Sequence, residues 1–202
     1  SGSGKSLLAG AVLNLLPGNA RVQGSITYKG EPLDAGKCKR YLGTEIAFIP
    51  QSVDYLDPLM RVEKQVIGVR GTPKRQKEVF RRYQLSDEAG KMYPFQLSGG
   101  MRQRVMIAMA LACKPKLLIA DEPTTALDVT IQAQILKLMN DMKEKLGTSI
   151  LFITHDLGVI NEMADKVAVM YCGQVVEMAD AKTIFTNGAY SHPYTEGLMI
   201  SI

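Results

Sequence analysis

Cysteine is scarce in the sequence, and its three copies lie far apart. Cys38, Cys113 and Cys172 include no CxxC pair and have no histidine at a metal-ligand spacing. This pattern argues against a disulfide framework and against a zinc site. It favours reduced thiols in the cytosol.

Long hydrophobic runs are missing as well. The longest run, 105–113, is far shorter than the roughly 20 apolar residues that span a bilayer, so we expect no transmembrane helix. The chain starts at Ser1 without a charged segment followed by an apolar one. We therefore expect no signal peptide and interpret the sequence as a fragment or a processed chain.

Glycine and proline show no period along the chain. Their 18 and 9 copies are scattered, and 46% of the residues are hydrophobic, which excludes collagen-like, mucin-like and disordered proteins. A length of 202 residues suggests one domain, with room for a subdomain. The net charge of +4 permits contact with nucleic acid without requiring it, because a nucleic-acid surface concentrates its charge in one stripe.

Strand-like and helix-like segments alternate, which predicts an α/β fold with a parallel sheet covered by helices. Apolar or alternating stretches predict strands, and apolar residues at 3.6-residue spacing predict helices. The predicted strands are 24–30, which is typical of a hairpin, 46–49, 117–120, 149–154 and 166–170. The predicted helices are 7–16, ended by Pro17-Gly18-Asn19, then 101–112, 131–146, closed by Gly147, and 156–163.

The segment 58–91 is charged and helix-compatible. It contains the basic clusters Lys74-Arg75-Lys77 and Arg81-Arg82. We interpret these clusters as a solvated helical face rather than a binding patch, since charged runs on predicted helices are usually exposed.

The first six residues match the end of a phosphate-binding loop. Ser1-Gly2-Ser3-Gly4-Lys5-Ser6 fits the second half of G-x-x-x-x-G-K-[ST]. Glycines there let backbone N–H groups close around phosphate oxygens, Lys5 would reach the β- and γ-phosphates, and Ser6 would ligate Mg²⁺. Taken alone, a flexible Ser/Gly linker explains the segment equally well.

A pair of acids follows the predicted strand 117–120. Asp121 is placed to bind Mg²⁺, and Glu122 to orient or deprotonate water. A strand followed by Asp-Glu is by itself also typical of a helix cap or a surface turn. The order of the two motifs, with the phosphate loop first, favours a nucleotide site.

A third motif opens the helix 101–112. Ser98-Gly99-Gly100 offers a hydroxyl, free backbone N–H groups and a helix N-terminus, which together suit an anion, although a plain helix cap would look the same. Leu97 to Gln103 resembles the signature of ATP-binding cassette (ABC) ATPases, with Met101 where many members have Gln.

Three further positions match the same family in order. Gln51, after the strand 46–49, resembles the Q-loop glutamine, and His155, after the strand 149–154, resembles the switch histidine. Thr125-Ala126-Leu127-Asp128 resembles the D-loop. Taken singly, Gln51 is typical of an exposed loop and His155 of a strand end, but six motifs in one order point to the family.

A narrower resemblance covers most of the chain. Tyr93-Pro94-Phe95-Gln96, the segments 101–112 and 121–134, and His192-Pro193-Tyr194-Thr195 resemble the dipeptide, oligopeptide and nickel importer ATPases. Members of that family begin earlier, with a strand before the phosphate loop and an aromatic residue that stacks on adenine. We therefore expect the first strands of the fold to be missing from this sequence.

The resemblance implies a P-loop NTPase (RecA-like) fold, one ABC ATPase domain over 1–202 with an inserted helical subdomain at about 58–112. It implies ATP hydrolysis with Mg²⁺ held by Ser6, Gln51 and Asp121. Glu122, His155 and Gln51 would be catalytic. The nucleotide-binding residues would be Ser1, Gly2, Ser3, Gly4, Lys5, Ser6, Ser98, Gly99, Gly100 and Asp128, the signature acting on the nucleotide of a partner cassette.

The implied partners are a second ABC ATPase subunit and the permease on the cytoplasmic face of a prokaryotic membrane, with an external binding protein acting indirectly. Cargo would be peptides or nickel. We expect Asp54, Tyr55, Leu56 and Leu59 to meet the permease.

Two other classes remain open. A nucleic-acid-associated ABC ATPase is disfavoured by the short spacing between Ser6 and Ser98, which leaves no room for a long coiled coil, so we expect no nucleic acid partner. A module that does not hydrolyse ATP is disfavoured by the presence of Glu122 and His155.

Overall fold

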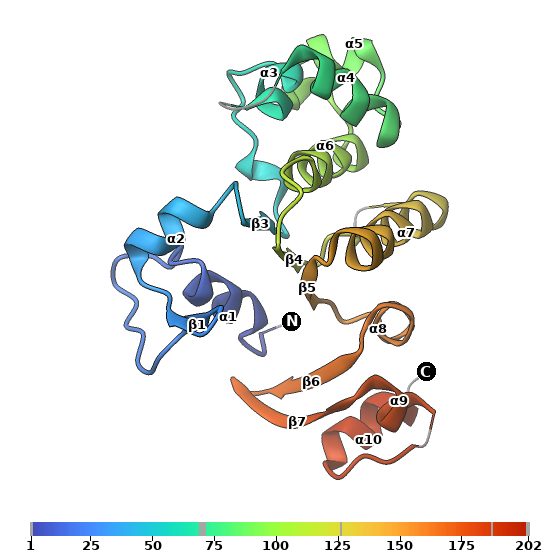
Figure 1. Cartoon of the computed structure of the whole chain (residues 1–202). Coiled ribbons are helices and arrows are strands. Elements are labelled where there is room, and N and C mark those ends of the chain that lie inside the picture. Colours follow the sequence, from blue (N-terminus) through green and yellow to red (C-terminus); the bar gives the residue numbers. More distant parts are fainter. Residues whose placement is uncertain (1, 69–71, 126, 187, 201–202) are drawn as a thin grey trace. The chain divides into compact units, whose positions relative to one another are not determined.

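The chain forms two compact units in the computed structural model (Figure 1). The structure describes residues 2–68, 72–125, 127–186 and 188–200. The terminal unit consists of Ser1–Arg40 and Phe152–Ile202, and the central unit of Tyr41–Leu151. No helix in the described ranges has the length and apolar character needed to cross a membrane.

A parallel sheet with two largely buried strands organises the central unit. β3 (Ile46–Ile49) pairs in parallel with β4 (Leu117–Asp121), with Ile46 opposite Leu117 and Ile49 opposite Ala120. β5 (Ser149–Ile153) completes the order β3-β4-β5. Continuous apolar runs suit strands that are covered on both faces. The predicted strands 46–49 and 117–120 are confirmed.

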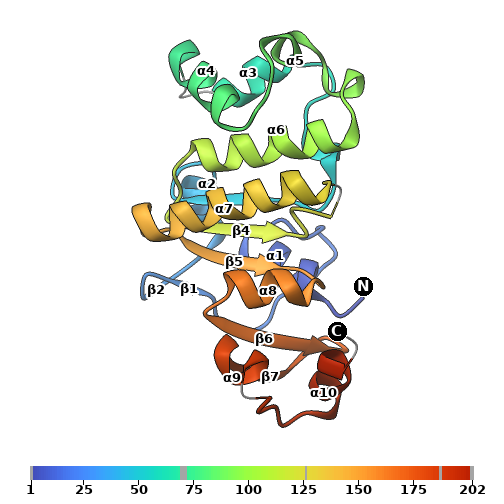
Figure 2. The same ribbon diagram turned by 90° about the vertical axis from the view of Figure 1, so that its right-hand side faces the viewer.

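Two long helices accompany this sheet. α6 (Gly99–Ala112) and α7 (Val129–Leu146) run side by side along β4 (Figure 2). α6 packs on β3, and Val105 and Ile107 are fully buried. α7 ends at Gly147, the residue that was predicted to close the helix, which adopts a left-handed conformation with a φ of 62°.

Short helices precede α6 in the central unit. They are η1 (Val53–Tyr55), α3 (Val62–Ile67), α4 (Pro73–Arg82), α5 (Asp87–Lys91) and η2 (Pro94–Gln96). Thr72 and Ser86 cap α4 and α5 with their hydroxyls, and Phe80 is buried among the helices. Except for η1, these helices fall in the segment 58–112 that was expected to form a helical subdomain, whose boundaries stay a prediction.

The terminal unit combines segments from both ends of the chain. Val167, Val169, Ala181 and Ile184 form its buried cluster. Its elements are α1 (Lys5–Val12), β1 (Thr27–Tyr28), β2 (Glu31–Pro32), α2 (Ala35–Tyr41), α8 (Leu157–Met163), β6 (Lys166–Tyr171), β7 (Gln174–Asp180), α9 (Ala181–Phe185) and α10 (Pro193–Ile200).

Two expectations for this unit differ from the structure. α1 ends at Val12 rather than at residue 16, because Asn14 adopts a φ of 53° and the Leu15 N–H bonds back to the Gly10 carbonyl at 2.8 Å. β6 does not extend the parallel sheet that was described above. It pairs antiparallel with β7, because Cys172 and Gly173 turn the chain with φ of 46° and 80°.

Tyr83, the residue that caps the C-terminal end of α4, makes the central unit less stable at alkaline pH. Its side chain is 5% exposed, and burial raises the pKa of Tyr83 to about 12. The folded chain therefore holds this proton more tightly than the unfolded chain does. The corresponding stability is complete below pH 10 and is lost as the pH rises toward 12.

We expect the free energy of unfolding of the wild-type chain to fall by roughly 3 kcal/mol more than that of Tyr83→Phe over this range. Urea unfolding of both chains at several pH values measures the difference. Parallel curves for the two chains would show that the phenol is not protected from ionisation.

Candidate functional site

The start of α1 presents backbone N–H groups that no side chain of the described residues caps. Gly4 precedes the helix, and its first turn contains no acidic residue. Lys5 is half-buried at this end of the helix, and Ser6 is exposed. An uncapped helix start with a lysine and a hydroxyl suits an anion with several oxygens. Ser1, which was predicted to belong to this loop, lies outside the described residues.

The loop before α1 requires glycine for its backbone. Gly2 and Gly4 have φ of 98° and 85°, a region that other residues adopt at a cost. A Cβ on Gly4 would meet the Gly173 Cα at 3.6 Å, which is an ordinary contact. Conformation rather than crowding therefore explains these two glycines.

Asp121 ends β4 inside the core of the central unit. The residue is 3% exposed, and its Oδ1 atom has no hydrogen-bond partner within the described part of the chain. A buried carboxylate oxygen without a donor is unfavourable unless a cation compensates it. Mg²⁺ binds carboxylate oxygens, so Asp121 fits a magnesium ligand.

Glu122 follows directly but has a different environment. It is half-buried, and its Oε2 atom accepts a hydrogen bond from the Thr125 hydroxyl at 2.9 Å. Its φ is 49°, an uncommon value for a residue with a side chain and one that is often found at active sites. The turn thus separates the two neighbouring carboxylates, one buried as a ligand would be and one accessible as a base would be.

Gln103 holds the turn that contains Glu122, a contact that we did not predict from the sequence. Its side chain is 1% exposed, and its Nε2 atom donates to the Pro123 carbonyl at 2.8 Å. Gln103 lies on α6, so this bond ties that helix to the residue after Glu122. The sequence signals at this position are its place at the end of the signature-like segment and a polar residue on the apolar face of a predicted helix.

The signature segment starts α6. The Ser98 hydroxyl accepts a hydrogen bond from the Met101 N–H at 3.3 Å, so Ser98 is the cap of the helix. A Cβ on Gly99 would meet no described atom within 4 Å. Packing within the described residues therefore does not require glycine there, and the space is open to an external group.

Three predicted residues lie in exposed positions. Gln51 lies two residues beyond β3, at the same edge of the parallel pair as Asp121. His155 lies two residues beyond β5, in the terminal unit. Asp128 caps α7, because its Oδ1 atom accepts from the Ile131 N–H at 3.0 Å.

The predicted residues divide between the two units. Gly2 to Ser6 and His155 belong to the terminal unit. The central unit brings Gln51 and Asp121 to one sheet edge, with Glu122 next to Asp121. Ser98 and Glu122 belong to the same unit, and Gln103 links the helix of one to the turn of the other.

Residues 1–125 match the family described as ABC transporter. The oligopeptide transport ATP-binding protein AppD of Bacillus subtilis is 47% identical over all of this chain, which covers 66% of that protein. The oligopeptide transport ATP-binding protein OppD of Salmonella typhimurium is 45% identical over all of this chain, which covers 64% of that protein. The chain thus spans somewhat less than two thirds of these curated relatives.

Solved structures show the same fold. A dimeric bacterial ABC transporter cassette superposes with a TM-score of 0.79 and 28% identity, covering 90% of this chain and 82% of the other. A post-hydrolysis cassette dimer bound to ADP and Pi superposes with a TM-score of 0.77 and 27% identity. The match covers 89% of this chain and 81% of the other. The expected P-loop NTPase fold of the ABC type is confirmed.

Loss of the Gln103 amide should destabilise the central unit. Gln103→Leu leaves the buried Pro123 carbonyl without its donor, which should cost about 1–3 kcal/mol in the free energy of unfolding. Gln134→Leu is the control, because it removes an exposed amide from α7. Chemical unfolding measures both, and equal changes in the two variants would contradict the role of the bond.

Proposed function

Because the chain belongs to the ABC transporter family, we propose that it binds and hydrolyses ATP as the energising subunit of an importer that takes up peptides through a membrane permease. The observation that carries this proposal is the end of β4, where a buried Asp121 with an unpartnered oxygen precedes a left-handed Glu122. The two curated relatives above are oligopeptide transport proteins, which favours peptides over nickel as cargo.

The phosphates of ATP would bind at the start of α1. The N–H groups after Gly2 and Gly4 would contact phosphate oxygens, with Ser1 and Ser3 completing the loop. Lys5 would pair with the β- and γ-phosphates. The uncapped helix N-terminus supports this assignment, since it favours negative charge without any further group.

Asp121, Ser6 and Gln51 would hold Mg²⁺. The unpartnered Oδ1 atom of Asp121 supports a cation at this point. When bound, the ion would neutralise charge on the phosphates.

Glu122 would polarise the attacking water, and His155 would contact the γ-phosphate. The Thr125 hydroxyl would orient the Glu122 carboxylate through its 2.9 Å hydrogen bond. Gln103 would keep the turn in place through the Pro123 carbonyl. Catalysis would then rest on positioning and on charge stabilisation, as in other phosphoryl transfers.

The signature residues of this chain would act on a second cassette, either a second copy or a related one. Ser98, Gly99 and Gly100 would contact the nucleotide of that partner, and Asp128 would lie near the same interface. The open space beside Gly99 supports close approach of an external group. The dimers of the two related cassettes support this mode of assembly.

The segment after Gln51 would meet the permease on the cytoplasmic face of a prokaryotic membrane, with an external binding protein delivering the cargo. Tyr55 and Leu59 are 66% and 87% exposed, which supports them as contacts together with the exposed Asp54. Leu56 is 4% exposed, so its burial gives no support to its expected role as a contact, which stays a prediction. Its side chain is buried in the core of the central unit.

Neutralising Glu122 and neutralising Asp121 should affect different steps, turnover in the first case and Mg-ATP binding in the second. In the full-length protein with its partners, Glu122→Gln should keep ATP binding and lower turnover at least ~100-fold, since it removes the base. Asp121→Asn should weaken Mg-ATP binding and raise thermal stability without the ion, since it removes a buried unpaired charge.

Single-turnover assays and ATP titrations separate these effects. Glu144→Gln, an exposed carboxylate on α7, is the control and should change neither quantity. Unchanged turnover in Glu122→Gln would refute the role of Glu122 as the base.

Ser98→Arg should block ATP-dependent dimerisation and leave ATP binding to the monomer intact. A long cation there would fill the space that a partner's nucleotide needs. Ser86→Arg is a matched control, because Ser86 caps α5 with its hydroxyl as Ser98 caps α6.

Light scattering of full-length chains that carry Glu122→Gln measures dimerisation with and without ATP. We expect dimers with Ser86→Arg and monomers with Ser98→Arg. Dimers in both variants, or loss of ATP binding by the Ser98→Arg monomer, would exclude a contact across the interface.

A further inference from the structure

Two hollows of the central unit adjoin each other between α4 and α7. The larger, of about 250 Å³, is lined by α4 and by the C-terminal ends of α6 and α7. The smaller, of about 210 Å³, is lined by the end of α4 and the middle of α7. Arg82 and Tyr83 line both hollows, so the two meet at these residues, and we call the pair of hollows the α4–α7 groove.

The walls of the groove carry an excess of positive charge. Two acids, Glu78 and Asp141, oppose the cations that line it. Asp141 already pairs with Lys145 at 2.9 Å, and this hydrogen bond holds the pKa of the carboxyl below its usual value. The lining cations are Lys74, Arg75, Arg82, Arg104, Lys114 and Lys137.

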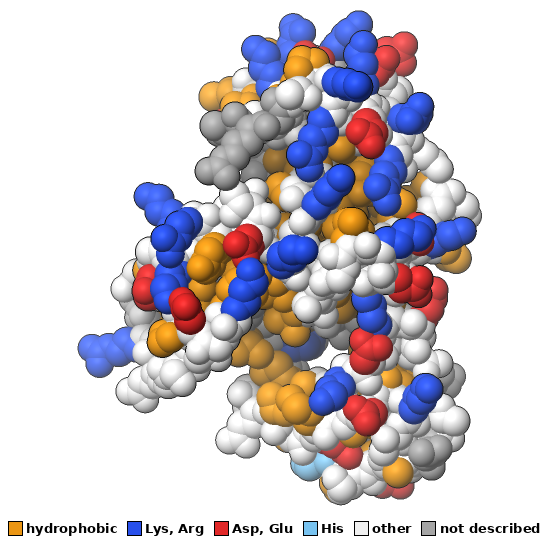
Figure 3. Space-filling model, in the orientation of Figure 1, with side chains coloured by type: hydrophobic (Ala, Val, Ile, Leu, Met, Phe, Trp, Pro, Cys, Tyr) orange, Lys and Arg blue, Asp and Glu red, His pale blue; other side chains and the backbone are white. Residues whose placement is uncertain are grey.

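The groove also has an apolar floor. Val79, Leu111 and Met142 line it and are themselves buried among the helices. Figure 3 shows hydrophobic surface between Lys and Arg side chains over α4, α6 and α7. Charged walls above an apolar floor match a ligand that is both acidic and partly apolar.

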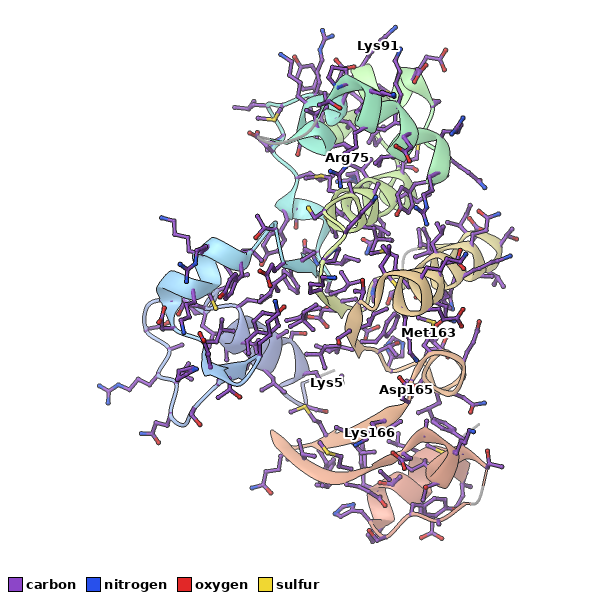
Figure 4. All side chains as sticks on the ribbon, in the orientation of Figure 1. Lys5, Arg75, Lys91, Met163, Asp165 and Lys166 are labelled. Carbon is purple, nitrogen blue, oxygen red and sulfur yellow. The ribbon has the colours of Figure 1, made fainter. Side chains whose placement is uncertain are left out.

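Not every cation is equally available. Arg75 donates a hydrogen bond to the Ala112 carbonyl, so it satisfies the C-terminal end of α6 (Figure 4). Arg104 is half-buried and donates to the Gln84 carbonyl at 3.4 Å. Arg82 and Lys137 are exposed, and Arg82 lies where the hollows meet. Lys74 and Lys114 are exposed as well, but they line only the larger hollow. Arg82 and Lys137 both attract the Asp141 carboxylate and help to lower its pKa, so these two cations already lie where a carboxylate is accommodated.

We propose that the α4–α7 groove binds an acidic amphipathic segment of a partner protein, which places apolar side chains in the two hollows and carboxylates against Arg82 and Lys137. Charge complementarity of this kind increases the association rate and fixes the register of a peptide. Under this proposal, the basic clusters of α4, which were interpreted above as a solvated face, form part of a binding surface.

A nucleic acid fits the groove less well. Single strands bind by stacking bases on exposed aromatic rings, and the aromatic residue that lines the groove, Tyr83, is 5% exposed. The cations surround a recessed apolar floor, which apolar side chains fill and phosphates do not.

The proposal is tested with a fluorescent peptide in which Glu and Leu recur on one helical face, titrated against the full-length protein without nucleotide. We expect binding that weakens with salt. The double variant Arg82→Glu with Lys137→Glu should lose affinity at least ~10-fold. Hydrogen exchange should show protection of α4 and of the second half of α7.

The control is Lys64→Glu with Lys91→Glu, an equal change of charge at exposed lysines of the same unit that do not line the groove. It should bind the peptide like the parent. A second peptide with Ser in place of Leu should bind at least ~10-fold more weakly, since it cannot fill the hollows.

Equal losses in the two double variants, equal binding of the Ser peptide, or protection elsewhere would overturn the proposal. Preferential binding of single-stranded DNA through Arg82 and Lys137 would overturn it in favour of a nucleic acid. Because no arm uses ATP, the result is independent of the proposed ATPase function.

Discussion

The site in the central unit depends on the parallel pairing of β3 with β4, because this pairing fixes the position of Asp121 at the end of β4. Ile46 to Ile49 pair residue by residue with Leu117 to Ala120, and β4 is buried from Leu118 onward. Asp121 is therefore held away from water with one oxygen unpartnered. A buried carboxylate in such a position persists only where the packing of the surrounding strands and helices is stable enough to hold it there. The stability of the core thus maintains a locally unfavourable group that suits a cation.

The same principle governs the residue that follows. Glu122 adopts a left-handed backbone that costs free energy, and the bonds from Thr125 and Gln103 hold the turn around it. α6 takes part in this support while its first residues form the signature. A displacement of this helix would therefore act on the turn that carries Glu122. Ser98, which caps α6, and Gln103, which contacts the turn, belong to the same helical segment.

α6 also shows how one helix serves two kinds of chemistry. Its N-terminal end carries no acidic side chain in its first turn and begins at Ser98, which suits an anion. Its C-terminal end has partial negative charge, and Arg75 donates to the carbonyl of Ala112 there. The helix dipole thus favours phosphate at one end and basic side chains at the other, where the α4–α7 groove begins.

Local chemistry was enough to predict much of this protein from its sequence. Apolar runs and caps depend on neighbouring residues, so β3, β4 and the end of α7 at Gly147 agree with the sequence, while α6 begins at Gly99 and thus two residues before the predicted start. The motif order indicated the family, which the comparisons confirm, while the roles of the individual site residues stay predictions. The tertiary structure alone decided the antiparallel pairing of β6, the burial of Leu56, the bond from Gln103 to Pro123 and the α4–α7 groove. Each of these depends on groups that a turn or a packed helix brings together across the chain, and periodicity and motif spacing contain no information on such contacts.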